Sequence, residues 1–227
     1  MYKRQVISDD SDTDGDSLSV SGTVTQTSAT DTSGSSITIN SPNSASVGSA
    51  VTGYYGQLTL NSNGTYSYVA NQSNADALDS GESATDVFTF TVSDGTTTTS
   101  STITFTVNGA NDAPTASDNT VTTTEDNNHT FAASEFGFTD VDGDSLDHVT
   151  IATLPSTGTL YLSGVAVSAG DQISAANISN LVFTPAANGN GSPYDTFTFS
   201  VNDGTTDSAS NYTCLLYTSP SPRDAHK

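Results

Sequence analysis

The strongest constraint on this fold is a two-residue alternation of apolar and hydroxyl side chains that recurs along the chain. It is clearest in residues 86–92 and 101–107, where aromatic and aliphatic residues alternate with threonine. Successive side chains of a β-strand point to opposite faces, so each segment predicts a half-buried strand with threonine towards water. No segment keeps a helical period. The predicted fold class is therefore all-β.

The strand signals also repeat, which indicates more than one copy of a topology. Residues 195–204 resemble residues 86–95 at an offset of 109, and the Gly-X-Leu-X-Leu segment at Gly56 returns at Gly158 at an offset of 102. A changed offset means loops of different length. We predict two tandem β-sandwiches, at 9–110 and 111–213, with the boundary in the extended stretch before Pro114.

An acidic motif repeats at a third offset. Asp-Thr-Asp-Gly-Asp-Ser-Leu at 12–18 matches Asp-Val-Asp-Gly-Asp-Ser-Leu at 140–146, an offset of 128. Between the acidic motif and the Gly-X-Leu strand the first repeat is therefore longer by 128 minus 102, or 26 residues. An extra hairpin or a long loop is expected there.

Charge excludes several classes of partner. The chain has 25 Asp and Glu against 4 Lys and Arg, for a formal net charge of -21. The electric field of such a charge repels nucleic acid and anionic membrane surfaces. The sequence also has no run of about twenty apolar residues, so no membrane-spanning segment is predicted. A hydrophobic fraction of 33% with this charge is also typical of disorder. Strand alternation argues against disorder, and the two observations agree if a divalent cation supplies positive charge and couples folding to metal binding.

Both ends differ from the rest. All four bases are Lys3, Arg4, Arg223 and Lys227, and the last residues hold the lone cysteine, Cys214, and a Ser-Pro-Ser-Pro run. The N-terminus has no apolar segment typical of a signal peptide. The offset of 109 residues between the two repeats would align residues 212–216 with the strand at 103–107, which predicts a last strand there. Unlike 103–107, however, residues 212–216 are not followed by a linker. We therefore predict foreign or disordered tails at 1–8 and 214–227, and an internal piece of a longer protein.

The acidic loop at 140–144 predicts a calcium site. Asp140, Asp142 and Asp144 offer hard oxygen ligands, which Ca²⁺ accepts in irregular geometry, whereas zinc prefers His or Cys. An EF-hand starting at Asp140 would need Gly at its sixth position and Glu at its twelfth, where Ser145 and Ile151 stand. The EF-hand is rejected. The matching acids near the start, Asp12, Asp14 and Asp16, form either a second site or a solvated cluster.

These motifs together resemble known bacterial repeats. The segment Gly-Gln-Leu-Thr-Leu-Asn-Ser-Asn-Gly-Thr-Tyr-Ser-Tyr, the later Val-Ser-Asp-Gly and the Asn-Gly-Ala-Asn-Asp-Ala-Pro linker resemble the VCBS repeat. The second repeat, with Phe-Thr-Asp-Val-Asp-Gly-Asp-Ser-Leu, resembles bacterial cadherin-like tandem domains. The resemblance covers about 9–213. It implies that the two sandwiches are tandem Ig-like or cadherin-like Greek-key β-sandwiches. It also implies that they are extracellular and strung in large surface adhesins, which type I systems often secrete and which often carry RTX repeats.

The cadherin-like resemblance also implies which residues hold Ca²⁺. Residues of the linker would act together with acids of the following domain, and a glutamate near the first strand and aspartates at strand ends would add ligands. The implied set is Asn111, Asp112, Glu125, Asp140, Asp142, Asp144, Asp203 and, in the first repeat, Asp94. The linker departs from the family pattern because Gly109 and Ala113 replace its outer ligands. The competing interpretation is ordinary Asx-turn chemistry without metal.

Three functions remain open at this point. The leading hypothesis is a non-enzymatic, calcium-stabilised spacer whose partners are neighbouring repeats of the same chain. The second is a module that binds a cell-surface glycan or protein, with Tyr54, Tyr55, Tyr66 and Tyr68 either as a sugar-stacking platform or as core. The third, an enzyme, lacks a recognisable motif, because His129 and His148 have no Ser or Cys nucleophile in a known arrangement.

Overall fold

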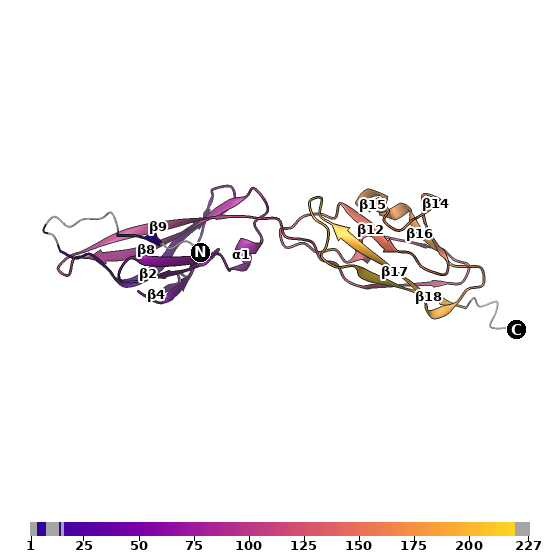
Figure 1. The fold of residues 1–227 in the computed structure, drawn as a ribbon, viewed down its shortest axis with the longest axis horizontal. Coiled ribbons are helices and arrows are strands. Elements are labelled where there is room, and N and C mark those ends of the chain that lie inside the picture. Colours follow the sequence, from indigo (N-terminus) through magenta and orange to yellow (C-terminus); the bar gives the residue numbers. More distant parts are fainter. Residues whose placement is uncertain (1–3, 8–13, 15, 221–227) are drawn as a thin grey trace. The chain divides into compact units, whose positions relative to one another are not determined.

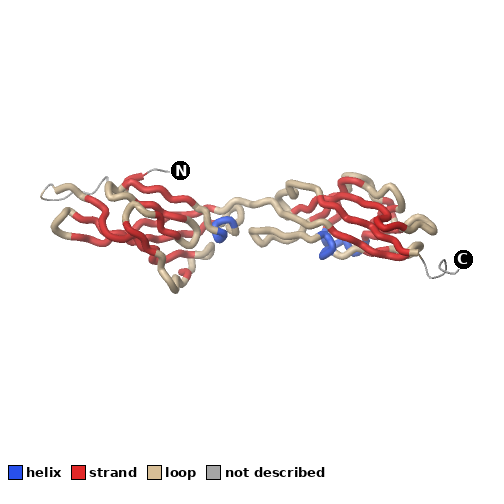
Figure 2. Tube along the Cα trace, turned by 90° about the horizontal axis from the view of Figure 1, so that it is seen from below, coloured by secondary structure: helices blue, strands red, loops and turns tan. Residues whose placement is uncertain are grey.

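The computed structural model describes residues 4–7, 14 and 16–220. Strands dominate and helices are short, as Figure 2 shows, which confirms the predicted all-β class. The chain divides into two compact units, Met1–Asn111 and Asp112–Lys227. The longest helical segment in the described part has six residues, and no described helix could cross a membrane.

The first unit consists of two sheets and one short helix, α1 (Ser73–Asp76), labelled in Figure 1. Its strands are β1 (Arg4–Gln5), β2 (Ser19–Thr30), β3 (Ser36–Ile37), β4 (Ser44–Ser46), β5 (Ala50–Thr52), β6 (Gln57–Leu60), β7 (Thr65–Val69), β8 (Ser83–Ser93) and β9 (Thr98–Asn108). One sheet has the order β1-β7-β6-β5, and the other has the order β3-β2-β8-β9 with β4 also on β2. The 26 extra residues of the first repeat thus contribute β3 and β4, which both pair with β2.

Local sequence explains the strongest pairings of this unit. β6 and β7 form a hairpin around an Asn-Gly turn, where Gly64 has a φ of 80° that favours glycine. β8 and β9 pair without a register shift from Ser83–Asn108 to Ser93–Thr98. The inward face of β8 holds Phe88 and Phe90, as the alternation predicted, but it also buries the carboxylate of Asp86. Two apolar clusters form the core.

The second unit also has two sheets. Its strands are β10 (Asn119–Thr124), β11 (His129–Thr130), β12 (His148–Thr153), β13 (Thr159–Leu162), β14 (Val165–Ala166), β15 (Gln172–Ser174), β16 (Leu181–Thr184), β17 (Gly191–Asn202) and β18 (Tyr212–Ser219), and its 3-10 helices are η1 (Ala133–Phe136) and η2 (Ala175–Asn180). The sheet orders are β10-β18-β17-β12-β15 and β11-β16-β13-β14. β10 pairs with β18 in parallel, while β17 pairs antiparallel with both β18 and β12.

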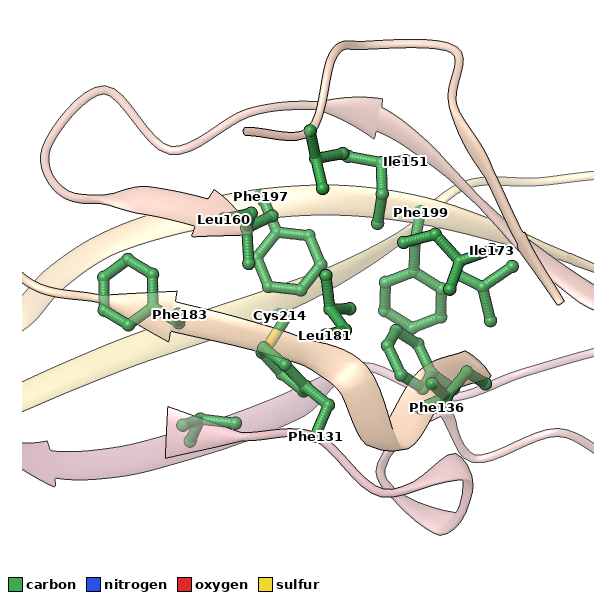
Figure 3. Packing of buried hydrophobic residues seen from close by; sticks show 14 of the residues in the cluster. Phe131, Phe136, Ile151, Leu160, Ile173, Leu181, Phe183, Phe197, Phe199 and Cys214 are labelled. Carbon is green, nitrogen blue, oxygen red and sulfur yellow. The ribbon is translucent and has the colours of Figure 1, made fainter. Parts of the chain in front are cut away.

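One continuous core lies between these two sheets. Figure 3 shows aromatic and branched side chains from both sheets pointing into the same space. Phe136 and Phe199 meet edge to face with ring centroids 4.9 Å apart, and Phe131 and Phe197 do so at 5.7 Å. Burial of apolar side chains such as these is the dominant favourable term in folding.

The structure corrects the predicted tails. β18 continues to Ser219, and Cys214, Leu216 and Thr218 are buried on its inner face, so residues 214–219 belong to the fold and the predicted tail begins too early. The alternation of that strand was visible, but the foreign-looking composition outweighed it. At the other end, Arg4 and Gln5 pair with β7, which contradicts a tail covering those residues. Residues 1–3, 8–13, 15 and 221–227, and with them Asp12, lie outside the described residues.

Candidate functional site

The candidate site is the loop that leads from η1 to β12 in the second unit. Thr115 and Thr139 form an isolated antiparallel bridge with two backbone hydrogen bonds of 2.8 Å each, and their hydroxyls lie 2.8 Å apart. This bridge ties the segment that enters the unit to the residue just before Asp140. Backbone pairing therefore brings two acidic stretches together that are almost thirty residues apart in the chain.

Asp140 organises the turn through one of its two carboxylate oxygens. Its Oδ1 accepts hydrogen bonds from the backbone N–H groups of Asp142, at 2.9 Å, and Asp144, at 3.2 Å. Gly143 between them has a φ of 88°, which favours glycine in this tight turn. Asp140 Oδ2 is buried and has no hydrogen-bond partner among the described residues. A buried carboxylate oxygen without a partner is costly and calls for a cation or an ordered water.

A second contact joins the entering segment to the acidic turn. The backbone N–H of Asp112 donates to Asp142 Oδ2 at 2.7 Å. Asp112 is exposed, whereas Asp142 and Asp144 are half-buried. Asn111, the last residue of the first unit, directly precedes Asp112 in the chain. The structure therefore places Asp112, in the segment that enters the unit, next to the acidic turn that holds Asp140, Asp142 and Asp144.

The acidic side chains of this arrangement do not by themselves form a complete set of metal ligands. Across residues 4–7, 14 and 16–220, no three His, Cys, Asp or Glu side chains meet as a group that could hold a metal ion. A calcium ion bound here would have to draw further oxygens from backbone carbonyls, an asparagine or water. Ca²⁺ commonly combines such ligands with carboxylates.

Asp94 and Asp203 occupy equivalent turns in the two units and show the same turn chemistry. Asp94 Oδ1 accepts from the N–H groups of Thr96 and Thr97 at 2.7 and 2.6 Å, and Asp203 Oδ1 accepts from those of Thr205 and Thr206 at 2.6 Å each. Hydrogen bonds from the hydroxyl and N–H of Thr97 and the N–H of Thr96 lower the pKa of Asp94 to about 2. At both positions one carboxylate oxygen is committed to closing an Asx turn.

The two aspartates differ in their surroundings. Asp203 is 8% exposed and follows Asn202, whose carbonyl accepts from the N–H of Asp147, so it lies at the end of the second unit that also holds the start of β12. Asp94 belongs to the first unit. Only Asp203 thus shares a unit with the acidic turn.

Glu125 lies at the other end of β10 from the Thr115–Thr139 bridge. Its N–H donates to the carbonyl of Ser219 at 2.9 Å, and its Oε2 accepts from Asn190 Nδ2 at 3.2 Å. The six residues of β10 separate it from the bridge, roughly 20 Å at the rise of an extended strand. The structure does not bring Glu125 to Asp140.

Sequence reasoning missed Asp86, the most buried acid of the first unit. Asp86 is fully buried, and its carboxylate accepts hydrogen bonds from five neutral donors. These are the N–H groups of Tyr54, Tyr55 and Gly56 at 2.9, 3.0 and 3.1 Å, Tyr68 Oη at 2.7 Å and Gln26 Nε2 at 3.2 Å. Asp86 therefore fixes the loop between β5 and β6.

The second unit also has an aspartate that accepts hydrogen bonds from a loop, but with fewer donors. Asp195, at the matching position 109 residues later, accepts from Ser156 Oγ at 2.8 Å and from the N–H of Thr157, just before Gly158. Burial raises its pKa, but hydrogen bonds from Thr196, Ser156 and Thr157 outweigh that effect and lower it. The two offsets mark Asp86 and Asp195 as equivalent, and likewise the loops ending at Gly56 and Gly158, but the sequence carries no signal that each aspartate contacts its loop.

The histidines and tyrosines named in the sequence analysis make contacts within the fold. His129 Nε2 lies 3.0 Å from Glu135 Oε1, and His148 Nδ1 lies 2.7 Å from Asp147 Oδ2. All four tyrosines pack against the core: Tyr55 is 4% exposed, Tyr54 meets the Tyr55 ring edge to face with ring centroids 5.0 Å apart, and Tyr66 and Tyr68 contact Phe105, the latter stacked with ring centroids 4.2 Å apart.

The architecture places the protein among Ig-like β-sandwich modules. Residues 111–213, which make up most of the second unit, match the family model of the bacterial Ig domain. No curated protein shows significant sequence similarity to the chain.

Among solved structures, the chain is similar to the endo-fucoidan hydrolase MfFcnA4 from glycoside hydrolase family 107. The two share 22% identity with a TM-score of 0.30 over 76% of this chain and 23% of that one. Domains 1–6 of the surface layer protein SbsC match with 13% identity and a TM-score of 0.26, over 88% of this chain and 28% of theirs. Its domains 4 and 5 match with 13% identity and a TM-score of 0.25, over 88% and 99%. At such TM-scores these likenesses carry no argument about function.

Proposed function

We propose that the chain is a structural and adhesive repeat region of an extracellular bacterial surface protein, stabilised by calcium. The bacterial Ig domain match supports a repeat module of this class. The high acidity and the VCBS-like and cadherin-like motifs support a surface adhesin, exported by a type I system, whose partners are neighbouring repeats. We propose no catalytic role.

The observation that carries the calcium proposal is Asp140. One oxygen of its carboxylate holds the turn, and the other is buried without a hydrogen-bond partner in the described part of the chain. In our proposal this second oxygen binds Ca²⁺ together with Asp142, Asp144 and the Asp112 segment. The ion supplies the positive charge that a chain with a formal net charge of -21 lacks.

The consequence of calcium binding is mechanical. The ion would tie residues at the start of the second unit to the acidic turn, so the segment at Asn111 and Asp112 would stiffen. Because a ligand that binds only the folded state stabilises it by mass action, low calcium would leave the chain loose and millimolar calcium would order it. We propose that this linkage keeps the chain exportable inside the cell and rigid outside.

Calorimetry on the full chain tests this proposal. We expect millimolar Ca²⁺ to raise the melting temperature relative to chelator, and isothermal titration to detect binding. Asp140→Ala should weaken binding at least tenfold and Asp112→Ala should weaken it less, because Asp112 is exposed. The matched control is Asp171→Ala, an exposed acid of the same unit whose carboxylate only caps a turn at Ser168. An unchanged melting temperature between chelator and calcium would rule out the mechanism.

A second candidate function, binding of a cell-surface ligand, is favoured by a separate observation in the first unit, described next.

A further inference from the structure

A hollow of about 300 Å³ opens on the first unit where the 26-residue extension meets the loop between β5 and β6. Carboxamide side chains dominate its lining, with one aromatic ring beside them. The lining residues used below are Gln26, Asn40, Asn43, Gln72, Asn74 and Tyr54. None of the residues around the hollow is acidic or basic. Its volume is at the small end of the range for ligand sites, which suits a single ring.

The walls of this hollow are fixed before any ligand arrives. Asn43 Nδ2 donates to the carbonyl of Thr52 at 3.0 Å, and Asn74 Nδ2 donates to that of Tyr54 at 3.1 Å. Gln26 Nε2 donates to Asp86 at 3.2 Å, and Gln26 is only 2% exposed. Each amide thus spends one N–H on the fold, and buried Gln26 forms part of the base. Asn43 and Asn74 are exposed, and their oxygens and second N–H groups are not used in these bonds, so each can still offer an acceptor and a donor.

The base of the hollow is closely packed. Gly53 lines it, and a Cβ at that position would collide with the Asp86 carboxylate and the Phe88 ring. The backbone N–H of Tyr54 donates to Asp86, so the same carboxylate that fixes the loop also fixes the backbone that carries the Tyr54 ring. Tyr54 remains half-exposed, unlike its neighbour Tyr55.

We propose that this hollow binds one ring of a neutral saccharide. Sugar hydroxyls both donate and accept hydrogen bonds, and paired carboxamides match that pattern, while the apolar face of a pyranose packs on an aromatic ring such as Tyr54. The lack of basic residues, the buried Asp86 beneath and a formal net charge of -21 disfavour sialylated, uronic or sulfated sugars. The first unit would then contact glycans directly.

An array of neutral and anionic glycans probed with the full chain tests this proposal, followed by titration calorimetry with the best neutral oligosaccharide. We expect neutral glycans to bind and anionic ones to fail. Asn40→Ala and Tyr54→Ala should each weaken binding about tenfold, as the loss of a hydrogen bond or of ring stacking predicts. Asn40 makes no side-chain hydrogen bond within the described part of the chain, so its loss should leave folding unchanged.

The matched control is Asn177→Ala, an exposed asparagine of the second unit, which should bind like the parent. Binding should persist in chelator as long as the first unit stays folded by circular dichroism, so failure of the calcium proposal and failure of this one are separable. The proposal is overturned if no neutral glycan binds at millimolar concentration, if only anionic glycans bind, or if Asn40→Ala and Tyr54→Ala bind like the parent.

Discussion

Replacing Asp86 should damage the first unit more than any surface change. In Asp86→Ala, three backbone N–H groups lose their acceptor, and two of them belong to the buried residues Tyr55 and Gly56. Tyr68 Oη and Gln26 Nε2 lose theirs as well, but these groups can rotate. A buried donor left unsatisfied costs about 1–3 kcal/mol, so the expected loss is about 4 kcal/mol. That is a large fraction of the about 5–15 kcal/mol by which native proteins are stable.

Two further variants separate the contributions. Both oxygens of Asp86 face only donors, so Asp86→Asn keeps the shape but turns an NH₂ group towards an N–H, and it should cost about 2 kcal/mol. Asp195→Ala is the matched control in the second unit. Asp195 is only half-buried, so water can replace its bonds to Ser156 and Thr157, and the expected cost is about 1 kcal/mol.

Urea unfolding of the full chain, read out by amide hydrogen exchange, measures these losses unit by unit. The amides of Tyr54, Tyr55 and Gly56 should lose protection first in Asp86→Ala. If Asp86→Ala destabilises the first unit no more than Asp195→Ala destabilises the second, the carboxylate does not hold the loop and the reasoning is refuted.

Two further predictions follow from shifted pKa values. Burial raises the pKa of the Cys214 thiol to about 12, so it should resist thiol reagents at pH 8 until urea unfolds the second unit, whereas immediate labelling would contradict a folded β18. Because the folded pKa of Asp94 is about 2, below its usual 3.8, its turn contributes stability that is present above pH 3.8 and lost as pH falls through 2. NMR titration of the Thr96 and Thr97 amides should show a midpoint near 2, and a midpoint near 3.8 would exclude these hydrogen bonds.

The sequence alone determined the strand content and the faces of the clearest strands. Alternation with a period of two is a local property, so Phe88 and Phe90 could be assigned to one buried face without knowledge of their partners. The Asn-Gly turn before Thr65 likewise fixed a hairpin, because the positive φ of Gly64 is a requirement of the backbone itself.

Composition is a poor guide to structure at the C-terminal end of the second unit. The residues after Thr213 look unlike the rest, yet Cys214, Leu216 and Thr218 keep the alternation of a strand, and β10 and β17 accept that strand between them. Pairing partners far apart in sequence decide whether such a segment folds.

Which acids share a neighbourhood was decided only by the tertiary structure. The carboxylates of Asp86, Asp140 and Glu125 look alike in the sequence, but the first faces five donors in a core and the second closes a turn with one oxygen to spare. The six residues of β10 separate Glu125 from the Thr115–Thr139 bridge beside Asp140, so Glu125 lies at the far end of that strand. A side chain's chemistry depends on burial and on partners from distant segments, and only long-range strand register places those partners.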